Sequence, residues 1–347
     1  MVGKIVIMAG GTGGHIFPAL AVALHLREQG WQVSWIGTEK GLEHRIVPEN
    51  NIELDLLTVN GLRGKGLLAK IKAPAMLLLA AFQAMKILRQ RQADVVLGMG
   101  GFVAGPGGLM AKLLGIPLVI HEQNRIVGTT NRYLAKFANV VLEAFPQSFP
   151  AKTQASCTGN PLRKQFNDLE SPVSHKPLRL LVVGGSLGAQ ILNEVVPKAV
   201  AQCYNIEVKH QTGKALFNEV TKSYQDLSIK AEVMVFIEDM ISAYLWADLV
   251  VCRAGAMTIS ELAAMGLPAV LIPYLYAIDD HQTANAHYLV EANAAVMIAQ
   301  QDLTAEKLLE SIQFIEKNQA QMRIAAKSCA CLEATERVAD FCIQAVK

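Results

Sequence analysis

The chain has 347 residues, of which 52% are hydrophobic and 18% are charged, and its formal net charge is +2. This length predicts two domains. The composition excludes bulk disorder, and the small net charge argues against general nucleic-acid binding. Six scattered cysteines without a CxxC pair predict reduced thiols and no zinc site. We expect no signal peptide, because a strand begins at Lys4, and no apolar run reaches the roughly 18–20 residues of a membrane span.

The chain opens with a strand, a glycine-rich turn and a helix. Lys4–Met8 is a short apolar strand, Gly10–His15 forms the turn, and the helix is predicted from about Phe17 to Gln29. Backbone amides approach an anion closely where no Cβ intervenes, so this turn is typical of phosphate binding. Its spacing matches neither the dinucleotide nor the ATP-binding glycine pattern, which weakens both interpretations. His15 is either a structural histidine or a general base.

Two segments share one order of features. Asp94–Leu97 is a strand, followed by a second glycine-rich loop (Gly98–Gly108), a helix (Leu109–Leu114), Gly-Ile-Pro and the strand Leu118–Ile120. Asp248–Ile272 repeats strand, glycine, helix, Gly-Leu-Pro and strand. This loose repeat predicts two similar α/β domains with doubly wound parallel sheets. Such sheets bind ligands at the carboxyl ends of their strands.

The second of these segments has the features of a nucleotide site. Its helix, Met257–Met265, offers free amides and the Thr258 and Ser260 hydroxyls, with Glu261 one turn in. Amides favour a phosphate, and a carboxylate suits ribose hydroxyls. The alternative is an ordinary capped helix. A third glycine loop, Gly184–Ala189, opens the same half of the chain.

A turn-rich stretch, 157–177, is predicted to contain the domain boundary. We place the N-terminal domain at residues 1–162 and the C-terminal domain at 163–347. After Leu303 the chain is predicted to be helical to its end, and the last helix is free to return to the N-terminal domain.

The segment 56–93 contains no acidic residue, and an apolar helix, 75–82, lies within it. A core helix is one interpretation. The other is a peripheral contact with an anionic membrane, since each basic residue near such a surface contributes about 1 kcal/mol. The seven basic residues of the segment are Arg63, Lys65, Lys70, Lys72, Lys86, Arg89 and Arg91.

Nine segments, in order, resemble the MurG family of bacterial N-acetylglucosaminyltransferases across essentially the whole chain. They are GGTGGHIFPALA, GLRGKG, GMGGFVAGPGG, HEQN, GNPLR, GGSLGAQILN, FIEDM, CRAGAMTISE and DDHQTANA. The resemblance implies the GT-B fold, in which two doubly wound Rossmann-like domains face across a cleft. It also implies an inverting transfer of GlcNAc from UDP-GlcNAc to the 4-hydroxyl of the muramoyl sugar on undecaprenyl diphosphate, which converts lipid I to lipid II.

The resemblance places the donor on the C-terminal half. Ile237 would face the uracil through its backbone, Glu261 would accept from the ribose, Ser186 and Arg163 would meet the diphosphate, and Gln282 would contact the sugar. The full donor set is Arg163, Ser186, Ile237, Ala256, Met257, Thr258, Ile259, Ser260, Glu261 and Gln282. On the opposite wall, the residues implied to reach the transferred sugar are Thr12, Gly13, Gly14 and Asn124.

The reaction needs a base and a stabilised leaving group. His15 is the first candidate base and Glu122 the second. Helix-terminal amides and an arginine would stabilise the charge on the leaving UDP. The sequence lacks the metal-holding Asp-x-Asp pattern, so we expect no essential metal and no cofactor.

The location implied by the resemblance is peripheral, on the cytoplasmic face of the inner membrane. Other cell-wall synthesis or division proteins are open as partners.

Two positions depart from the family pattern: Leu187 stands where glutamine is usual, and Arg125 where glycine is usual. Neither is a residue to which we assign chemistry. Two other functions stay open at this stage. A UDP-GlcNAc 2-epimerase would share the donor site without needing a membrane, and a non-catalytic subunit would only bind the nucleotide sugar.

Overall fold

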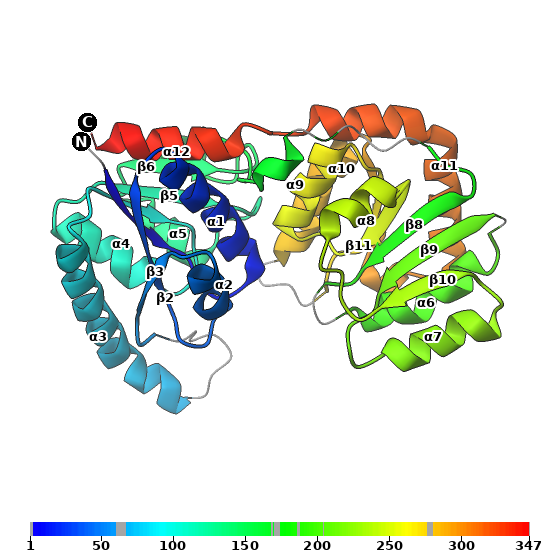
Figure 1. Cartoon of the computed structure of the whole chain (residues 1–347), viewed down its shortest axis with the longest axis horizontal. Helices are drawn as coiled ribbons and strands as arrows, with labels where there is room; N and C mark the ends of the chain where they lie inside the picture. The colour runs from blue at the N-terminus through cyan, green and yellow to red at the C-terminus, as the bar shows by residue number, and fades with distance from the viewer. Residues whose placement is uncertain are drawn as a thin grey trace. The chain divides into compact units, whose positions relative to one another are not determined.

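The computed structural model describes residues 3–59, 67–167, 169, 174–185, 188–203, 205–275 and 280–346, with the side chains of 67–73 left out. The chain forms two compact units (Figure 1). One comprises Met1–Lys164 and Cys331–Lys347, and the other comprises Gln165–Ala330. The chain therefore leaves the first unit two residues beyond the predicted boundary, and its last helix belongs to that unit.

The first unit is a parallel sheet with helices on both faces, as predicted. In the described residues, seven strands follow the order β3-β2-β1-β4-β5-β6-β7. They are β1 (Lys4–Met8), β2 (Gln32–Gly37), β3 (Glu53–Leu56), β4 (Val95–Gly98), β5 (Leu118–Glu122), β6 (Val140–Glu143) and β7 (Ser156–Cys157). The helices are α1 (Gly13–Glu28), α2 (Glu43–Glu49), α3 (Leu67–Arg91), α4 (Ala104–Leu113), α5 (Thr129–Leu134), α12 (Ala334–Ala345) and the short η1 (Ala151–Thr153).

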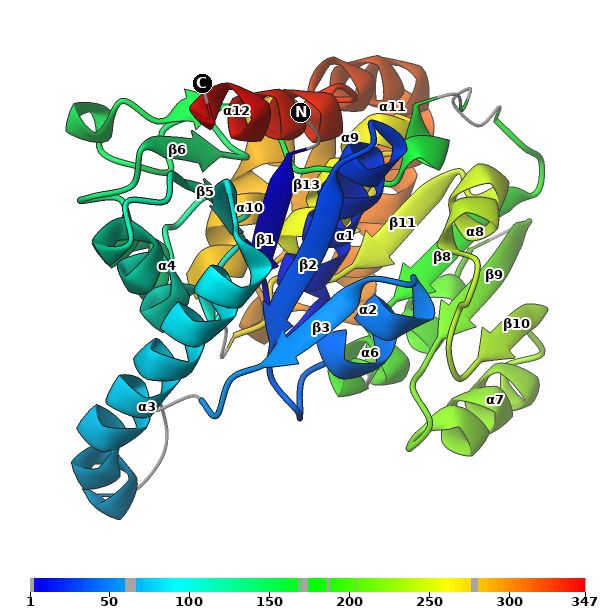
Figure 2. The ribbon, with the colours of Figure 1, turned by 60° about the vertical axis from the view of Figure 1, so that its left-hand side comes forward.

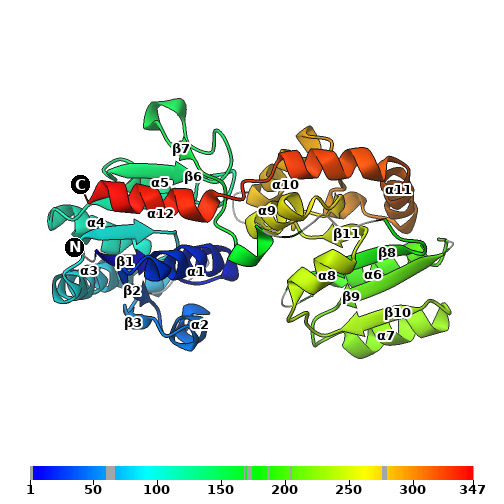
Figure 3. The ribbon, with the colours of Figure 1, turned by 45° about the horizontal axis from the view of Figure 1, so that its top comes forward.

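Alternate side chains of each strand enter different cores. In β1, Ile5 and Ile7 pack with residues of α1 and α12, whereas Val6 and Met8 pack with residues of α3 and α4. Figure 3 shows α12 beside α1 on the same face of the sheet. Thr335 ties α12 to the chain before the link, because its hydroxyl donates to the Leu162 carbonyl at 2.9 Å. The last segment thus completes the core that the first strand begins.

The second unit repeats the design. Six strands of the described residues follow the order β10-β9-β8-β11-β12-β13. They are β8 (Leu178–Val183), β9 (Ile206–Gln211), β10 (Ala231–Met234), β11 (Leu249–Cys252), β12 (Ala269–Leu271) and β13 (Ala295–Met297). The helices are α6 (Gln190–Val200), α7 (Phe217–Asp226), α8 (Met240–Trp246), α9 (Ala256–Met265), α10 (His281–Glu291), α11 (Ala305–Ser328) and the short η4 (Gln300–Asp302), while η2 (Lys164–Phe166) lies at the link.

Several predicted boundaries were wrong. Helix α1 begins at Gly13 rather than Phe17, and α4 at Ala104 rather than Leu109, because glycines are tolerated in a first turn whose amides lack intrahelical acceptors. The C-terminal segment is helical after Leu303, as predicted, in two helices: α11 ends at Ser328, and α12 belongs to the first unit.

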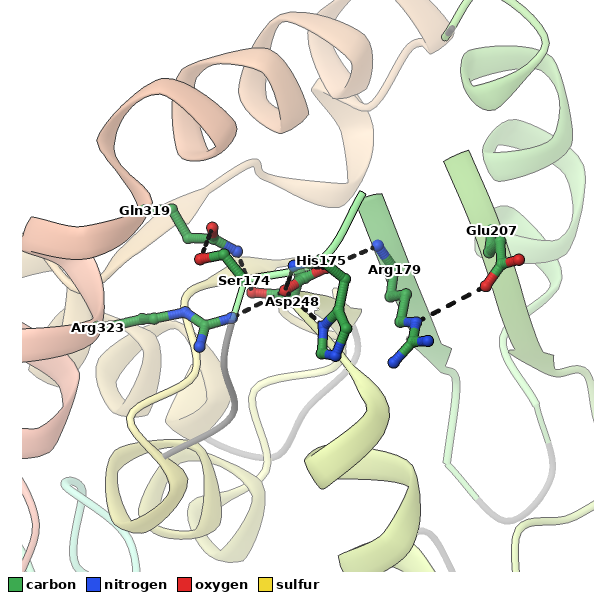
Figure 4. Close-up of polar contacts among 7 residues, drawn as sticks. All are labelled: Ser174, His175, Arg179, Glu207, Asp248, Gln319 and Arg323. Carbon is green, nitrogen blue, oxygen red and sulfur yellow. Dashed lines mark hydrogen bonds and ion pairs between the residues drawn. The ribbon is translucent and has the colours of Figure 1, made fainter. Parts of the chain in front are cut away.

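A buried carboxylate ties the entry of the second unit to its last helix (Figure 4). Asp248, just before β11, is fully buried. It accepts from the backbone amides of His175 (3.1 Å) and Arg179 (3.0 Å) and from the Arg323 guanidinium on α11 (3.0 Å). Gln319, also on α11, donates to the Asp248 carbonyl at 3.2 Å. These bonds join three segments that are far apart in the sequence.

We predict that Asp248→Ala lowers the unfolding free energy of the second unit by about 3 kcal/mol, because Arg323 and two amides lose their acceptor inside the protein. Chemical denaturation, followed through hydrogen exchange of the β8 and β11 amides, measures the change.

Glu207→Ala is the control, since Glu207 meets Lys230 (3.2 Å) and Arg179 (3.7 Å) in a solvent-accessible pair. Its cost should stay below about 1 kcal/mol. Equal losses in the two variants would contradict a special role for Asp248.

Candidate functional site

In the first unit, three loops emerge at one edge of the sheet. They follow β1, β4 and β5, and β4 pairs with both β1 and β5. Parallel strands end at the same edge, so the Gly10–His15 turn, the second glycine loop and the 121–124 segment lie together. The order of strands reverses between β1 and β4, which is where doubly wound sheets bind ligands.

The first two glycine loops pack backbone against backbone. A Cβ on Gly101 (φ +79°) would lie 2.5 Å from the Gly10 carbonyl oxygen, so only glycine fits there. Behind the first loop lies Glu43, whose side chain is fully buried. It accepts from the Gly11 amide at 3.0 Å and from the Thr38 amide and hydroxyl at 2.8 and 2.7 Å. Glu43 was not among the predicted site residues, because it lies 32 residues from the loop that it holds.

Three predicted site residues form the start of α1. Thr12 occupies the N-cap position with an extended backbone, and its carbonyl accepts from the His15 amide at 3.1 Å. Gly13 and Gly14 are therefore the first helical residues, whose amides have no acceptor within the helix. The positive end of a helix dipole and two glycines without side chains make this turn suitable for an anion.

His15 lies half-buried between the other two loops. Its Nδ1 is 2.7 Å from Oε1 of Gln123. The ring rests on Gly100 (φ +94°), where a Cβ would come within 3.0 Å of the imidazole. Glycine at this position thus admits the histidine, and the contact with Gln123 sets the direction of its ring. Gln123 was not among the predicted site residues, although it lies within the HEQN segment.

Glu122, the second candidate base, is enclosed at the end of β5. It is 2% exposed. Its carboxylate accepts from the Asn124 amide (3.1 Å), the Gly128 amide (3.0 Å) and the Asn131 side chain (3.0 Å). The Asn124 side chain also donates to it at 3.3 Å. These bonds make Glu122 the anchor of the loop that positions Asn124. Arg125 follows as a half-buried side chain.

The second unit places its own loops at the corresponding edge. The third glycine loop follows β8, but Ser186 and Leu187 lie outside the described residues. Gly188 (φ +75°) approaches the chain after β9 so closely that a Cβ would lie 1.9 Å from the Thr212 carbonyl oxygen. Asn193 on α6 donates to the same carbonyl at 3.0 Å. Together these contacts fix the path of the loop into α6.

Gln211, a residue missed from the sequence, links two predicted parts of this edge. It is the last residue of β9 and is buried. Its amide nitrogen donates to the Gly185 carbonyl at 2.6 Å, and its Oε1 accepts from the Ile237 amide at 3.1 Å. The glycine loop and the Ile237 backbone are therefore held by one side chain. The end of a strand beside a glycine loop is the sequence signal that indicates such a residue.

Helix α9 presents some of its predicted donor residues and buries others. Met257, Thr258, Ser260 and Glu261 are partly exposed, whereas the side chains of Ala256 and Ile259 are buried, so these two can contribute only through their backbone. The Ser260 hydroxyl donates to the Ala256 carbonyl at 3.1 Å. The helix begins after Gly255, with no acidic residue in its first turn.

Glu261 is oriented by a neighbour. The buried Tyr244 on α8 donates its hydroxyl proton to Oε2 of Glu261 at 3.0 Å. Gln282, at the start of α10, accepts from the Tyr274 amide at 2.9 Å through its side-chain oxygen Oε1. Arg163 is exposed and belongs to the first unit rather than to the second. Its contact with a diphosphate therefore stays a prediction.

Family models match both units of the chain. A model of the N-terminal domain of glycosyltransferase family 28 matches residues 5–143, and a model of the C-terminal domain of that family matches residues 179–342. The chain belongs to glycosyltransferase family 28. The predicted enzyme class is thereby confirmed, and with it the resemblance that the nine segments indicated.

Individual relatives of this family 28 chain are similar over their full length. A Methylococcus capsulatus protein is 56% identical, with 99% of both chains covered. It is named UDP-N-acetylglucosamine--N-acetylmuramyl-(pentapeptide) pyrophosphoryl-undecaprenol N-acetylglucosamine transferase. A Shewanella sediminis protein of the same name is 48% identical over 98% of this chain and 96% of its own. The crystal structure of Acinetobacter baumannii MurG is 41% identical, with a TM-score of 0.84 and 99% of both chains covered.

A more distant structure bears on the epimerase alternative. UDP-GlcNAc 2-epimerase from Neisseria meningitidis has a TM-score of 0.68 but only 13% identity, over 98% of this chain and all of its own. That likeness concerns the fold alone. For the described part of the family 28 chain, no helix combines the length and hydropathy that crossing a membrane requires.

Proposed function

We propose that the chain transfers N-acetylglucosamine from UDP-GlcNAc to the 4-hydroxyl of the muramoyl sugar of lipid I, with inversion, to form lipid II. The observation that carries this proposal is the 56% identity, over 99% of both chains, to a relative named for that reaction. The two loop-lined sheet edges support it, because each offers groups that suit one of the two substrates.

The donor is assigned to the second unit. Amides at the starts of α6 and α9 suit the diphosphate, and Glu261, oriented by Tyr244, suits the ribose hydroxyls. As the bond from the sugar to UDP breaks, negative charge develops on the diphosphate. Preorganised amides stabilise that charge without having to reorganise, which is how such groups lower a barrier.

The acceptor is assigned to the first unit. The starts of α1 and α4 follow the two packed glycine loops, and both first turns lack acidic residues, which suits the diphosphate of a lipid carrier. His15 lies at the same edge and supplies the base, while Asn124 and the residues from Thr12 to Gly14 are assigned to the sugar.

A lipid-borne acceptor also needs contact with a membrane surface, and α3 supports this. Its Ala80, Ala84 and Leu88 are buried against the sheet, whereas Leu78 and Phe82 are 73% and 62% exposed. The helix thus has both a core face and an apolar outer face. Figure 2 shows its N-terminal turns extending past the sheet.

Neighbouring residues extend this outer surface. Helix α4, which packs against α3, exposes Leu109 and Leu113, and Lys86, Arg89 and Lys112 are exposed cations on the two helices. An apolar surface bordered by cations is typical of a contact with anionic lipids. We assign this surface to the cytoplasmic leaflet, which makes the protein peripheral.

The basic segment contributes less charge than its sequence indicates. Arg91 forms ion pairs with Glu53 and, at 2.8 Å, with Asp55, so its charge is neutralised. Arg63 and Lys65 lie outside the described residues, and the side chains of Lys70 and Lys72 are not described.

The direct test is transfer of radiolabelled GlcNAc to a short-chain lipid-linked muramoyl pentapeptide, with EDTA present. We expect product, because amides and cations of the chain stabilise the leaving group. Product only after Mg²⁺ is added would contradict metal independence, whereas tight binding of UDP-GlcNAc without any product would favour a binding subunit or an epimerase.

Glu261→Ala should raise KM for UDP-GlcNAc by tenfold or more and change kcat less, since a hydrogen bond to a charged group contributes about 1.5–3 kcal/mol. Initial-rate kinetics measure both constants. Glu194→Ala, which removes an exposed acid of the same unit, is the matched control and should leave both constants unchanged. Unaltered donor affinity in Glu261→Ala would remove Glu261 from the site.

Changing Leu78 and Phe82 together to serine should weaken binding to phosphatidylglycerol vesicles about tenfold or more, because burial of each apolar side chain contributes about 1.5–3 kcal/mol. Cosedimentation measures binding, and the melting temperature of the double variant should equal that of the wild type. Phe314→Ser with Ile324→Ser is the control, since these residues of α11 are 53% and 73% exposed in the other unit. A large drop in melting temperature would instead indicate a core role.

A further inference from the structure

A chain of hydrogen bonds runs inward from His15 and ends on backbone carbonyls. Oε1 of Gln123 lies 2.7 Å from Nδ1 of His15. Nε2 of Gln123 lies 3.0 Å from Nδ1 of His121 and 3.0 Å from the His121 main-chain carbonyl. At the far end, Nε2 of His121 lies 2.9 Å from the Gly159 carbonyl. All these groups belong to the first unit.

The two carbonyls determine where the protons are. A carbonyl only accepts, so His121 must carry its proton on Nε2 to bond Gly159, which leaves its Nδ1 as an acceptor. Burial lowers the pKa of His121 to about 4, despite the opposing effect of the Gly159 carbonyl. The ring is therefore neutral near pH 7 and holds only that one proton.

The same reasoning fixes the amide of Gln123. Its nitrogen faces two acceptors, Nδ1 of His121 and the His121 carbonyl, so the amide cannot be turned around without losing both bonds. Its oxygen must then face His15. Because that oxygen only accepts, neutral His15 carries its proton on Nδ1. A neutral imidazole carries one proton, so Nε2 then holds the lone pair. Among the described residues, the hydrogen bonds of the His15 side chain involve Nδ1 alone.

We propose that Gln123, held in turn by His121, is a positioning residue that fixes His15 in the tautomer whose Nε2 accepts a proton. This inference deepens the proposed function and rests on it for its catalytic meaning. In the reaction, Nε2 takes the proton of the acceptor hydroxyl, whose oxygen bonds to C1 of the donor sugar. The bond from C1 to the diphosphate breaks, and its electron pair leaves with UDP. The imidazolium keeps its Nδ1–H bond to Gln123 and later returns the extra proton to water.

The ring direction has a second support. Gly100 packs against the face of His15, and a Cβ there would come within 3.0 Å of the ring. Two carboxylates of this edge are turned to partners of their own. Glu43 holds Gly11, and Glu122 holds the Asn124 loop. Gln123 is thus the group that determines the protonation pattern of His15.

The tautomer is tested without any activity measurement. Nitrogen NMR of protein labelled in the rings of its eight histidines distinguishes a protonated nitrogen from one with a lone pair. The His15 signal is identified by its loss in His15→Gln. We expect protonated Nδ1 and unprotonated Nε2 near pH 8. Protonated Nε2 in the wild-type chain would overturn the inference, even if transfer occurs.

Two variants test the consequence for catalysis. Gln123→Met removes the oxygen, so His15 should become a mixture of tautomers and kcat should fall about tenfold, with KM for UDP-GlcNAc unchanged. Gln123→Glu puts a carboxylate beside Nδ1, which favours the imidazolium. The acidic limb of its kcat profile should therefore move to higher pH, with activity recovering as the pH rises.

Asn139→Ala is the matched control, since it removes one hydrogen bond of the same unit, from the Leu118 amide at 3.0 Å, at the opposite end of β5 from Gln123. This variant should lose about as much melting temperature as the Gln123 variants do. Its kcat and the nitrogen NMR signal of His15 should stay as in the wild type. Unchanged kcat in Gln123→Met, or an unshifted profile in folded Gln123→Glu, would overturn the inference. Absence of transfer in the wild type would defeat the proposed function and leave the NMR result standing.

Discussion

The close approach of two backbones at Gly10 and Gly101 is the contact on which the first site depends. Parallel strands β1 and β4 deliver their loops to one edge, and there the loops meet with no room for a Cβ. That packing brings the start of α1 beside the second loop, and Gly100 then receives the ring of His15. The sheet sets where the loops emerge, and the glycines set how near one another they come.

Buried polar side chains hold these loops from behind, and each one takes part in several bonds. Glu43 and Glu122 accept from backbone amides in the first unit, and Gln211 bridges two loop segments in the second. Burying such groups is costly unless their bonds are made, so each fixes a unique local structure when all of its bonds form. Orienting the loops at both edges therefore requires polar side chains to be buried away from water.

The sequence predicted the sheets and the loops well, because apolar strands and glycine clusters are local signals. The strands around Val6 and Val250, and the position of Glu261 one turn into its helix, follow from short segments. Other features depend on contacts between distant residues. Glu43 meets a loop 32 residues away, and Thr335 meets Leu162 across 173 residues. Glycines also misled the prediction of α1 and α4, because a glycine run reads as a loop although a helix can begin within it.

An amide behind the proposed base suits the charge of the reaction. A carboxylate at that position would orient the imidazole equally well, but it would stabilise the imidazolium and keep the base protonated near neutral pH. The Gln123 oxygen orients Nδ1–H without adding a charge beside the predicted site of a diphosphate. A weak base is sufficient where the departing UDP takes up most of the developing charge. In the proposed mechanism, the series from Gly159 through His121 and Gln123 to His15 therefore sets the direction of the base, while the helix amides stabilise the developing charge.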